Sequence, residues 1–149
     1  MDMNALLQIK DLGAAAVLAL SAAGSAFGSG AAGMAAIGSW KKCFAQNKNA
    51  PFILTVFVGA PLSQTIYGMI VMNTFVELAK KGQFMAGAGI LCGLAIGMSA
   101  WMQGKAGAAA SDAMAETGKG FGNYLIVLGV IETVALFVMV FILMAAGKL

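Results

Sequence analysis

The sequence predicts an all-α membrane protein whose four transmembrane helices form two tandem, duplicated hairpins. Three observations predict this class. Of the 149 residues, 60% are hydrophobic and 10% are charged, whereas soluble domains have about 25% charged residues. Four long apolar stretches alternate with short polar segments, and the second pair of stretches resembles the first.

Each apolar stretch is long enough to cross a bilayer, because about 20 helical residues span about 30 Å of hydrocarbon. The stretches do not fit transmembrane β-strands, which alternate in polarity over about ten residues. The predicted spans are about 12–39, 52–79, 84–110 and 121–146, joined by polar loops at 40–50, 80–83 and 111–120. We therefore expect one membrane domain over 1–149, with hairpin 1 at about 12–79 and hairpin 2 at about 84–146.

The charges and cysteines argue against several classes of function. The net charge is +3 and the lysines are scattered, which argues against a nucleic-acid partner. Cys43 and Cys92 are isolated and there is no His, so neither a metal site with Cys or His ligands nor a disulfide framework is indicated. The sequence has no nucleotide-binding motif, and we expect no active site within it. The first residues lack the pattern of a cleaved signal peptide.

The lysines outside the spans divide evenly between the two ends of the predicted bundle. One end has Lys41, Lys42, Lys48 and Lys119, and the other has Lys10, Lys80, Lys81 and Lys148. Cytoplasmic loops carry an excess of positive charge, and here the counts are equal. The densest cluster lies in 40–50, which favours a cytoplasmic placement of 40–50 and 111–120.

The two hairpins are related by an internal repeat in the same orientation. The segment SAFGSGAAGMAA at 25–36 aligns with SAWMQGKAGAAA at 99–110. In the second helices, Gly59 aligns with Gly129 and Tyr67 aligns with Phe137. A parallel repeat disfavours the transporters whose two halves are inverted.

The first helix of each hairpin differs in composition from the second. Glycines recur every fourth residue, at Gly24 and Gly28 and again at Gly89, Gly93 and Gly97. Such rows let helix backbones approach closely, while the second helices are rich in Phe, Ile, Val, Leu and Met. A ring of many copies, with the slim helices inside and the bulky helices outside, fits both facts. Ordinary helix pairing within one bundle explains the glycine rows equally well.

Glu132 lies in the middle of the apolar run LGVIETVALFVMV and is the only acid deep in a predicted span. An acid at a helix centre costs roughly 2.5–3.5 kcal/mol on translocon scales, so the default interpretation is a functional residue. Reversible neutralisation by a metal ion or a proton explains why a carboxylate is kept there. A permanently protonated carboxyl that serves packing is the alternative.

The second span places polar groups on one helical stripe. In VFVGAPLSQTIYGM this stripe consists of Ala60, Ser63, Gln64 and Tyr67. Pro61 has no N–H and cannot bond the Phe57 carbonyl, so it loosens or kinks the turn. Irregular backbone at membrane depth is tolerated where it is buried or lines a site. A simple packing kink is the alternative for Pro61.

Gln103 in the third span completes a set of oxygen donors. One amide in a glycine-rich helix serves helix association, but two amides with a hydroxyl and a carboxylate are typical of a cation site. These oxygens, with a backbone carbonyl, suffice to replace most of a small ion's hydration shell. A proton needs only the carboxylate, so the surplus favours Na⁺ over H⁺.

Together these motifs resemble the proteolipid ring subunit (K or c) of V-type and A/V-type rotary ATPases. The resemblance covers all four spans and rests on the duplicated glycine-rich hairpin, GVIETVALF, PLSQTIYG and MQGKAG. It is strongest to the Na⁺-translocating bacterial branch. The resemblance implies that identical copies form a multi-subunit membrane rotor ring, coupled to ATP hydrolysis in the peripheral sector of the complex.

The resemblance also implies residue roles. The implied Na⁺ ligands are Glu132, Gln103, Gln64, the Ser63 hydroxyl and the Ala60 carbonyl, with Tyr67 as a supporting hydrogen-bond donor to Glu132. Family members often have Thr where this chain has Ser63, which keeps the hydroxyl but loosens its rotamer. Leu62 stands at the position of Glu132 in the repeat, which implies one ion site per two hairpins.

The implied partners are identical copies, a stator membrane subunit with a discharging cation, the central stalk and lipid. The implied location is the plasma membrane of a bacterium, with 40–50 and 111–120 in the cytoplasm and both termini outside. Three alternatives stay open: the same ring carrying H⁺, a small secondary antiporter that uses Glu132, and a structural or channel-forming membrane protein.

Overall fold

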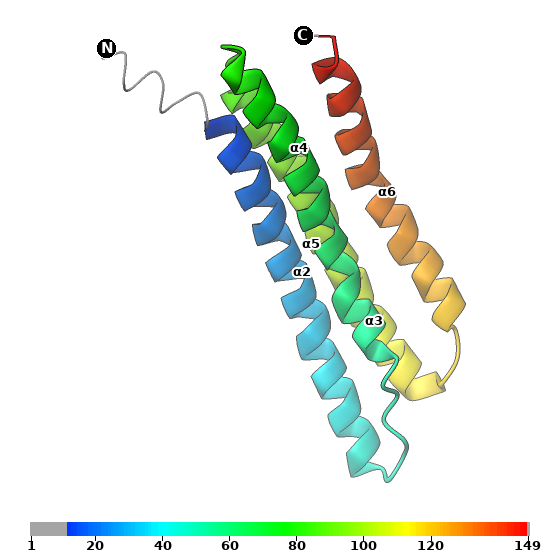
Figure 1. The fold of residues 1–149 in the computed structure, drawn as a ribbon. Coiled ribbons are helices and arrows are strands. Elements are labelled where there is room, and N and C mark those ends of the chain that lie inside the picture. The colour runs from blue at the N-terminus through cyan, green and yellow to red at the C-terminus, as the bar shows by residue number, and fades with distance from the viewer. Residues whose placement is uncertain (1–11, 149) are drawn as a thin grey trace.

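The computed structural model describes residues 12–148, and its ordered elements are all helices (Figure 1). They are α2 (Leu12–Ala45), α3 (Leu54–Gly59), the 3₁₀ helix η1 (Ala60–Leu62), α4 (Ser63–Lys80), α5 (Ala86–Thr117) and α6 (Phe121–Ala146). Because α3, η1 and α4 follow one another directly, the described chain has four helices long and apolar enough to cross a membrane. No strand occurs among residues 12–148. The predicted fold class is confirmed, while the expectations about the first residues lie outside the described part.

Two helices continue beyond the predicted spans, so the loops predicted at 40–50 and 111–120 start too early. α2 runs to Ala45 and α5 to Thr117. The prediction was wrong here because hydropathy marks the edge of the lipid, whereas backbone hydrogen bonds carry a helix on into water. An ion pair of 2.6 Å between Lys42 Nζ and Asp112 Oδ1 joins the two extensions. The residue after the end of α5, Gly118, caps the helix with a φ of 64°, which suits a glycine.

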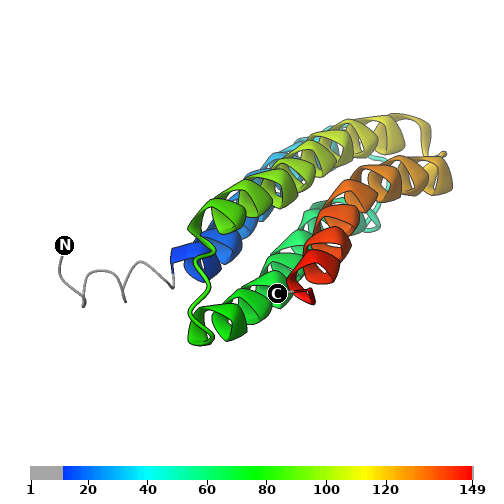
Figure 2. The same ribbon diagram turned by 90° about the horizontal axis from the view of Figure 1, so that it is seen from above.

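Two layers of helices make up the bundle. α2 and α5 make the most extensive contact and form one layer, and α4 and α6 form the other (Figure 2). In the first layer backbone lies against backbone: a Cβ on Gly24 would overlap the Gly97 backbone, and a Cβ on Gly104 would overlap the Gly28 backbone. The glycine rows therefore serve helix pairing within one copy, which was one of the two explanations of their spacing.

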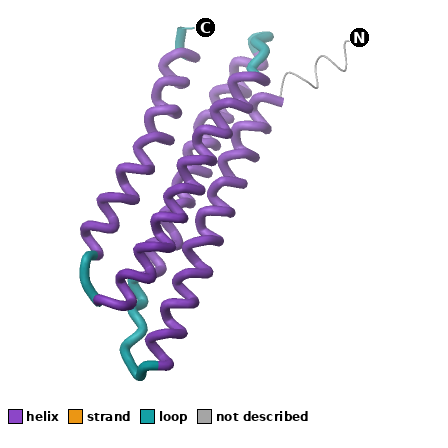
Figure 3. The backbone as a smooth tube through the Cα atoms, turned by 180° about the vertical axis from the view of Figure 1, so that it is seen from behind, coloured by secondary structure: helices purple, strands orange, loops and turns teal. Residues whose placement is uncertain are grey.

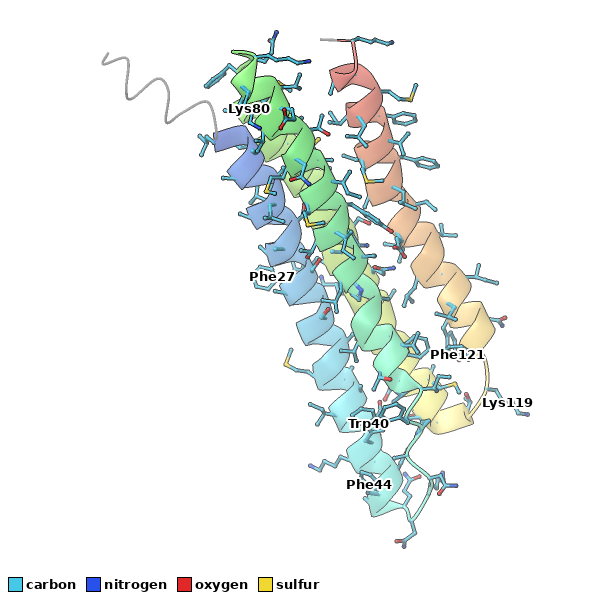
Figure 4. The ribbon with its side chains drawn as sticks, in the orientation of Figure 1. Phe27, Trp40, Phe44, Lys80, Lys119 and Phe121 are labelled. Carbon is cyan, nitrogen blue, oxygen red and sulfur yellow. The ribbon has the colours of Figure 1, made fainter. Side chains whose placement is uncertain are left out.

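The surface between the two ends of the bundle is apolar. The loops gather at the ends (Figure 3), and Lys80 and Lys119 lie at opposite ends (Figure 4). Between them, large side chains such as Met34 and Phe27 are 72% and 67% exposed. Extensive exposed apolar surface marks contact with a membrane or with other protein, which agrees with transmembrane helices.

Two apolar clusters divide the core along the helices. One contains Val71, Phe75 and Ile96, and the other contains Phe57 and Leu128. Along α3–η1–α4 the predicted polar stripe falls between Phe57 and Val71, and along α6 Glu132 follows Leu128 by one turn. The polar groups are thus held at mid-helix, with apolar packing above and below them.

Candidate ion-binding site

Glu132 receives hydrogen bonds from two other helices. The Tyr67 hydroxyl on α4 donates to Glu132 Oε1 at 2.6 Å, and Gln103 Nε2 on α5 donates to Glu132 Oε2 at 3.2 Å. Both carboxylate oxygens therefore accept a bond from a neutral donor. Side chains from α4 and α5 thus meet the Glu132 carboxyl group of α6 at mid-helix.

Gln103 is the centre of the polar network. Its side chain is fully buried, and its Nε2 also donates to the Leu128 carbonyl at 3.0 Å. Its Oε1 accepts a bond of 2.8 Å from Nε2 of Gln64, which is itself fully buried. Burying an amide costs free energy unless its donors and acceptors are satisfied, and here each amide is held by the other. The pair fixes α4 and α5 at the level of the carboxylate.

Beyond the two amides, three oxygen atoms lie close together. The Ser63 Oγ is 3.1 Å from the Ala60 carbonyl oxygen and 3.1 Å from Gln64 Oε1, and it donates toward these acceptors. These are three of the oxygens that the resemblance implied as ion ligands. A continuous chain of hydrogen bonds thus runs from Ala60 through Ser63, Gln64 and Gln103 to Glu132.

The local backbone explains how the three oxygens come together. The α-helix α3 ends at Gly59, and the chain takes a 3₁₀ turn at Ala60–Leu62 before α4 begins. Pro61 lies in this turn and is buried. A proline inside a helix removes one N–H and one backbone hydrogen bond. The irregular turn that the sequence predicts here is present, and it places the Ala60 carbonyl beside the Ser63 hydroxyl.

The charged groups of the described chain have partners other than Glu132: Lys105, two residues after Gln103, lies 4.5 Å from the centre of the Trp101 ring. The ion pairs of this part of the chain join Lys42 to Asp112 and Glu116, and Lys80 to Glu77, all at the ends of helices. Among residues 12–148 no ion pair involves Glu132. The carboxylate is therefore solvated by neutral dipoles, and its one negative charge matches one monovalent cation or one proton.

All of the predicted site residues meet in this network, although their role as ligands stays a prediction. Sequence reasoning missed two further groups: the Leu128 carbonyl, and Ser99, whose hydroxyl donates to the Ile131 carbonyl at 2.8 Å. A backbone acceptor has no signature in the sequence. Ser99 has one, because it precedes Gln103 by one helical turn and so shares its face.

The comparisons with known proteins agree with this geometry. Residues 86–145 match the family model that describes the C-subunit of ATP synthase. The matched segment is the second hairpin and contains both Gln103 and Glu132. No curated protein matches the chain. The second hairpin is therefore similar to the ATP synthase C-subunit, and this match supports a c-type, ion-carrying component of a membrane rotor ring, without an active site of its own.

Proposed function

We propose that this protein is the ring subunit of a V-type rotary ATPase and that it carries Na⁺ at Glu132. Each copy takes up one ion, moves with the ring, and releases the ion at the stator. The peripheral sector of the complex hydrolyses ATP and drives the rotation. The observation that carries the proposal is the continuous network from Glu132 to the Ala60 carbonyl, which joins polar groups of three helical spans at mid-helix.

The oxygen positions support a metal ion as the cargo. Hard cations are held by several oxygens, at about 2.3–2.6 Å in the case of Ca²⁺, so neighbouring ligands lie about 3–4 Å apart. The separations of 3.1 Å from Ser63 Oγ to the Ala60 and Gln64 oxygens fall in that range. A proton would use none of these additional oxygens.

A bound Na⁺ also explains how the carboxylate can travel through lipid. An isolated carboxylate in a medium of low dielectric constant faces an idealised cost of order 20 kcal/mol. One Na⁺ cancels the charge, and the Tyr67 bond to Glu132 holds the loaded form closed. Release of Na⁺ needs access of water to Glu132 and a compensating cation. A stator subunit in the bacterial plasma membrane would supply that cation.

The repeat supports the V-type assignment. The chain has two hairpins, but the position that aligns with Glu132 in hairpin 1 is Leu62. A ring with one carboxylate per four helices carries half as many ions as a ring with the same number of helices and one carboxylate in every hairpin. In this assignment the helix ends at Ala45 and Thr117 face the cytoplasm and the central stalk.

The test is the reaction of Glu132 with a hydrophobic carbodiimide in the purified ring. Na⁺ is expected to slow the labelling, whereas K⁺ at equal ionic strength is the control. The Gln64→Ala/Gln103→Ala double variant is expected to label at the same rate with and without Na⁺. Labelling that rises as the pH is lowered but is not slowed by Na⁺ at any pH, with wild-type behaviour of the double variant, would favour the H⁺-carrying ring instead. A native mass of a dimer would overturn the ring and favour a secondary antiporter.

A further inference from the structure

The helix that bears Glu132 has the least apolar packing of the bundle. On α6 the buried residues of the described structure are Leu128, Ala135 and Ala146, whereas α5 buries residues along its whole length. Apolar contacts are also non-directional. Packing alone is therefore a poor determinant of how α6 is rotated, although the direction of the Glu132 side chain depends on that rotation.

Two polar side chains of α5 bond the backbone of α6. The Ser99 hydroxyl donates to the Ile131 carbonyl at 2.8 Å, and Gln103 Nε2 donates to the Leu128 carbonyl at 3.0 Å. The donors are four residues apart on α5 and the acceptors three apart on α6, so each pair lies on one helical face. Both bonds point at carbonyls just before Glu132. Together they set the rotation and the height of α6 against α5.

We propose that Ser99 is a positioning residue that holds Glu132 in its ion-binding direction. Gln103 faces both the carboxylate and the Leu128 carbonyl, whereas Ser99 contacts the backbone alone. Its hydroxyl acts through the peptide that joins Ile131 to Glu132. The inference deepens the proposed function and rests on it for the identity of the ion.

Hairpin 1 supplies a matched comparison within the same chain. Ser25 aligns with Ser99 in the repeat, and the two are 2% and 6% exposed. Among the described residues the Ser25 hydroxyl has no hydrogen-bond partner, whereas Ser99 bonds Ile131. Removing either hydroxyl removes one buried oxygen from a glycine-rich helix. Removing the Ser99 hydroxyl also removes a bond to the helix of the carboxylate.

The experiment compares Ser99→Ala with Ser25→Ala in the purified ring. The readout is the Na⁺ concentration that halves the rate of carbodiimide labelling of Glu132. If α6 is free to turn, the fraction of copies in the binding direction falls, and the apparent affinity falls by the same factor. We expect this concentration to rise about three- to tenfold for Ser99→Ala, in line with the loss of one interhelical bond, and to stay within about twofold for Ser25→Ala.

Two further measurements separate positioning from mere stability. The thermal dissociation of the ring reports stability, and it is expected to fall slightly in Ser99→Ala, which loses an interhelical bond, and to stay near wild type in Ser25→Ala. Ser99→Thr keeps the hydroxyl and is expected to restore Na⁺ protection toward the wild-type value. Equal Na⁺ protection in the Ser99 and Ser25 variants, or a Thr variant as weak as the Ala variant, would overturn the inference. If Ser99→Ala does not assemble, Ser99→Cys gives the same readout, because a thiol is a much weaker donor.

A failure of the Na⁺ assignment can be distinguished from a failure of the inference about Ser99. If Na⁺ does not protect even the wild-type ring, the identity of the ion is wrong. The pH at which labelling is half-maximal then replaces the Na⁺ concentration as the readout. A shift in that pH for Ser99→Ala without a shift for Ser25→Ala supports the positioning role for a proton. Equal values in the two variants overturn it.

Discussion

The two hairpins share one architecture but treat their polar groups in opposite ways. In hairpin 2, Ser99 and Gln103 on α5 reach across to the backbone and carboxylate of α6. In hairpin 1 the aligned residues are Ser25 and Ser29, and among the described residues their hydroxyls find no hydrogen-bond partner. The position of Glu132 is taken by Leu62, which is 54% exposed.

Hairpin 1 has no carboxylate at the aligned position, and the hydroxyls of Ser25 and Ser29 make no hydrogen bond to its second helix. Its second helix instead gives Ser63, Gln64 and Tyr67 to the network around Glu132. The candidate site thus draws on residues of both hairpins, and each hairpin contributes a different part of it.

The largest expected effect concerns the aligned pair Glu132 and Leu62, where hairpin 2 alone has a carboxylate. Glu132→Gln removes the ionisable group, and ion-dependent ATP turnover of the assembled complex is expected to fall to background. Leu62→Ala, at the aligned position of hairpin 1, is expected to keep turnover close to wild type. Comparable loss in both variants would show that the site is not confined to Glu132.

A second comparison concerns two aligned glycines, Gly104 and Gly30. A Cβ on Gly104 would overlap the Gly28 backbone, whereas a Cβ on Gly30 would have no atom within 4 Å. Overpacking of this kind typically costs about 1–3 kcal/mol. The ring with Gly104→Ala is expected to dissociate at lower temperature than wild type, and Gly30→Ala is expected to match it. Equal stability of the two variants would contradict the backbone contact between α2 and α5.

A third comparison concerns the phenol that hairpin 1 contributes. Tyr67 aligns with Phe137 of hairpin 2, so Tyr67→Phe makes the two positions identical. The substitution removes the bond of 2.6 Å to Glu132. Bonds to charged groups contribute about 1.5–3 kcal/mol, so the Na⁺ concentration for half-protection is expected to rise about tenfold or more. Tyr124→Phe is the control, because Tyr124 packs edge-on against Phe57, away from the site. A similar rise in the control would mean that loss of any phenol loosens the ring.

The smallest expected effect lies at the extended helix ends. Lys42 of hairpin 1 pairs with Asp112 of hairpin 2, and both side chains are more than half exposed. Exposed ion pairs contribute little and are screened by salt. Lys42→Ala is expected to lower the dissociation temperature of the ring by about 2 °C or less, with the difference disappearing at high salt. Lys41→Ala serves as the matched control, and a large, salt-independent loss in Lys42→Ala would contradict an exposed pair.

The sequence was sufficient for the number and type of the helices, because 60% hydrophobic residues in four long stretches leave few alternatives. It was sufficient as well for the residues that meet around Glu132, because a polar group deep in an apolar span needs a partner. The irregular turn at Ala60–Leu62 followed from Pro61 alone.

Other features could not be predicted from the sequence for identifiable reasons. The ends of α2 and α5 lie beyond the apolar stretches, where hydropathy no longer reports on helix. The direction of the Gln103 amide depends on its neighbours, since the same side chain can present N–H groups or an oxygen to Glu132. The Ile131 and Leu128 carbonyls belong to the backbone, which every residue shares. Their use became visible only with α5 and α6 side by side.

The close approach of α2 and α5 also limits how this chain can change over evolutionary time. Where Gly28 touches Gly104, a larger side chain on one helix cannot be accommodated by shrinking a side chain on the other, because there is none to shrink. Paired substitutions that enlarge one side chain and shrink its neighbour are therefore excluded where α2 and α5 touch. Divergence between the two halves of the duplication is directed instead to the faces turned toward α4 and α6, which is where the single carboxylate and its neighbours are found.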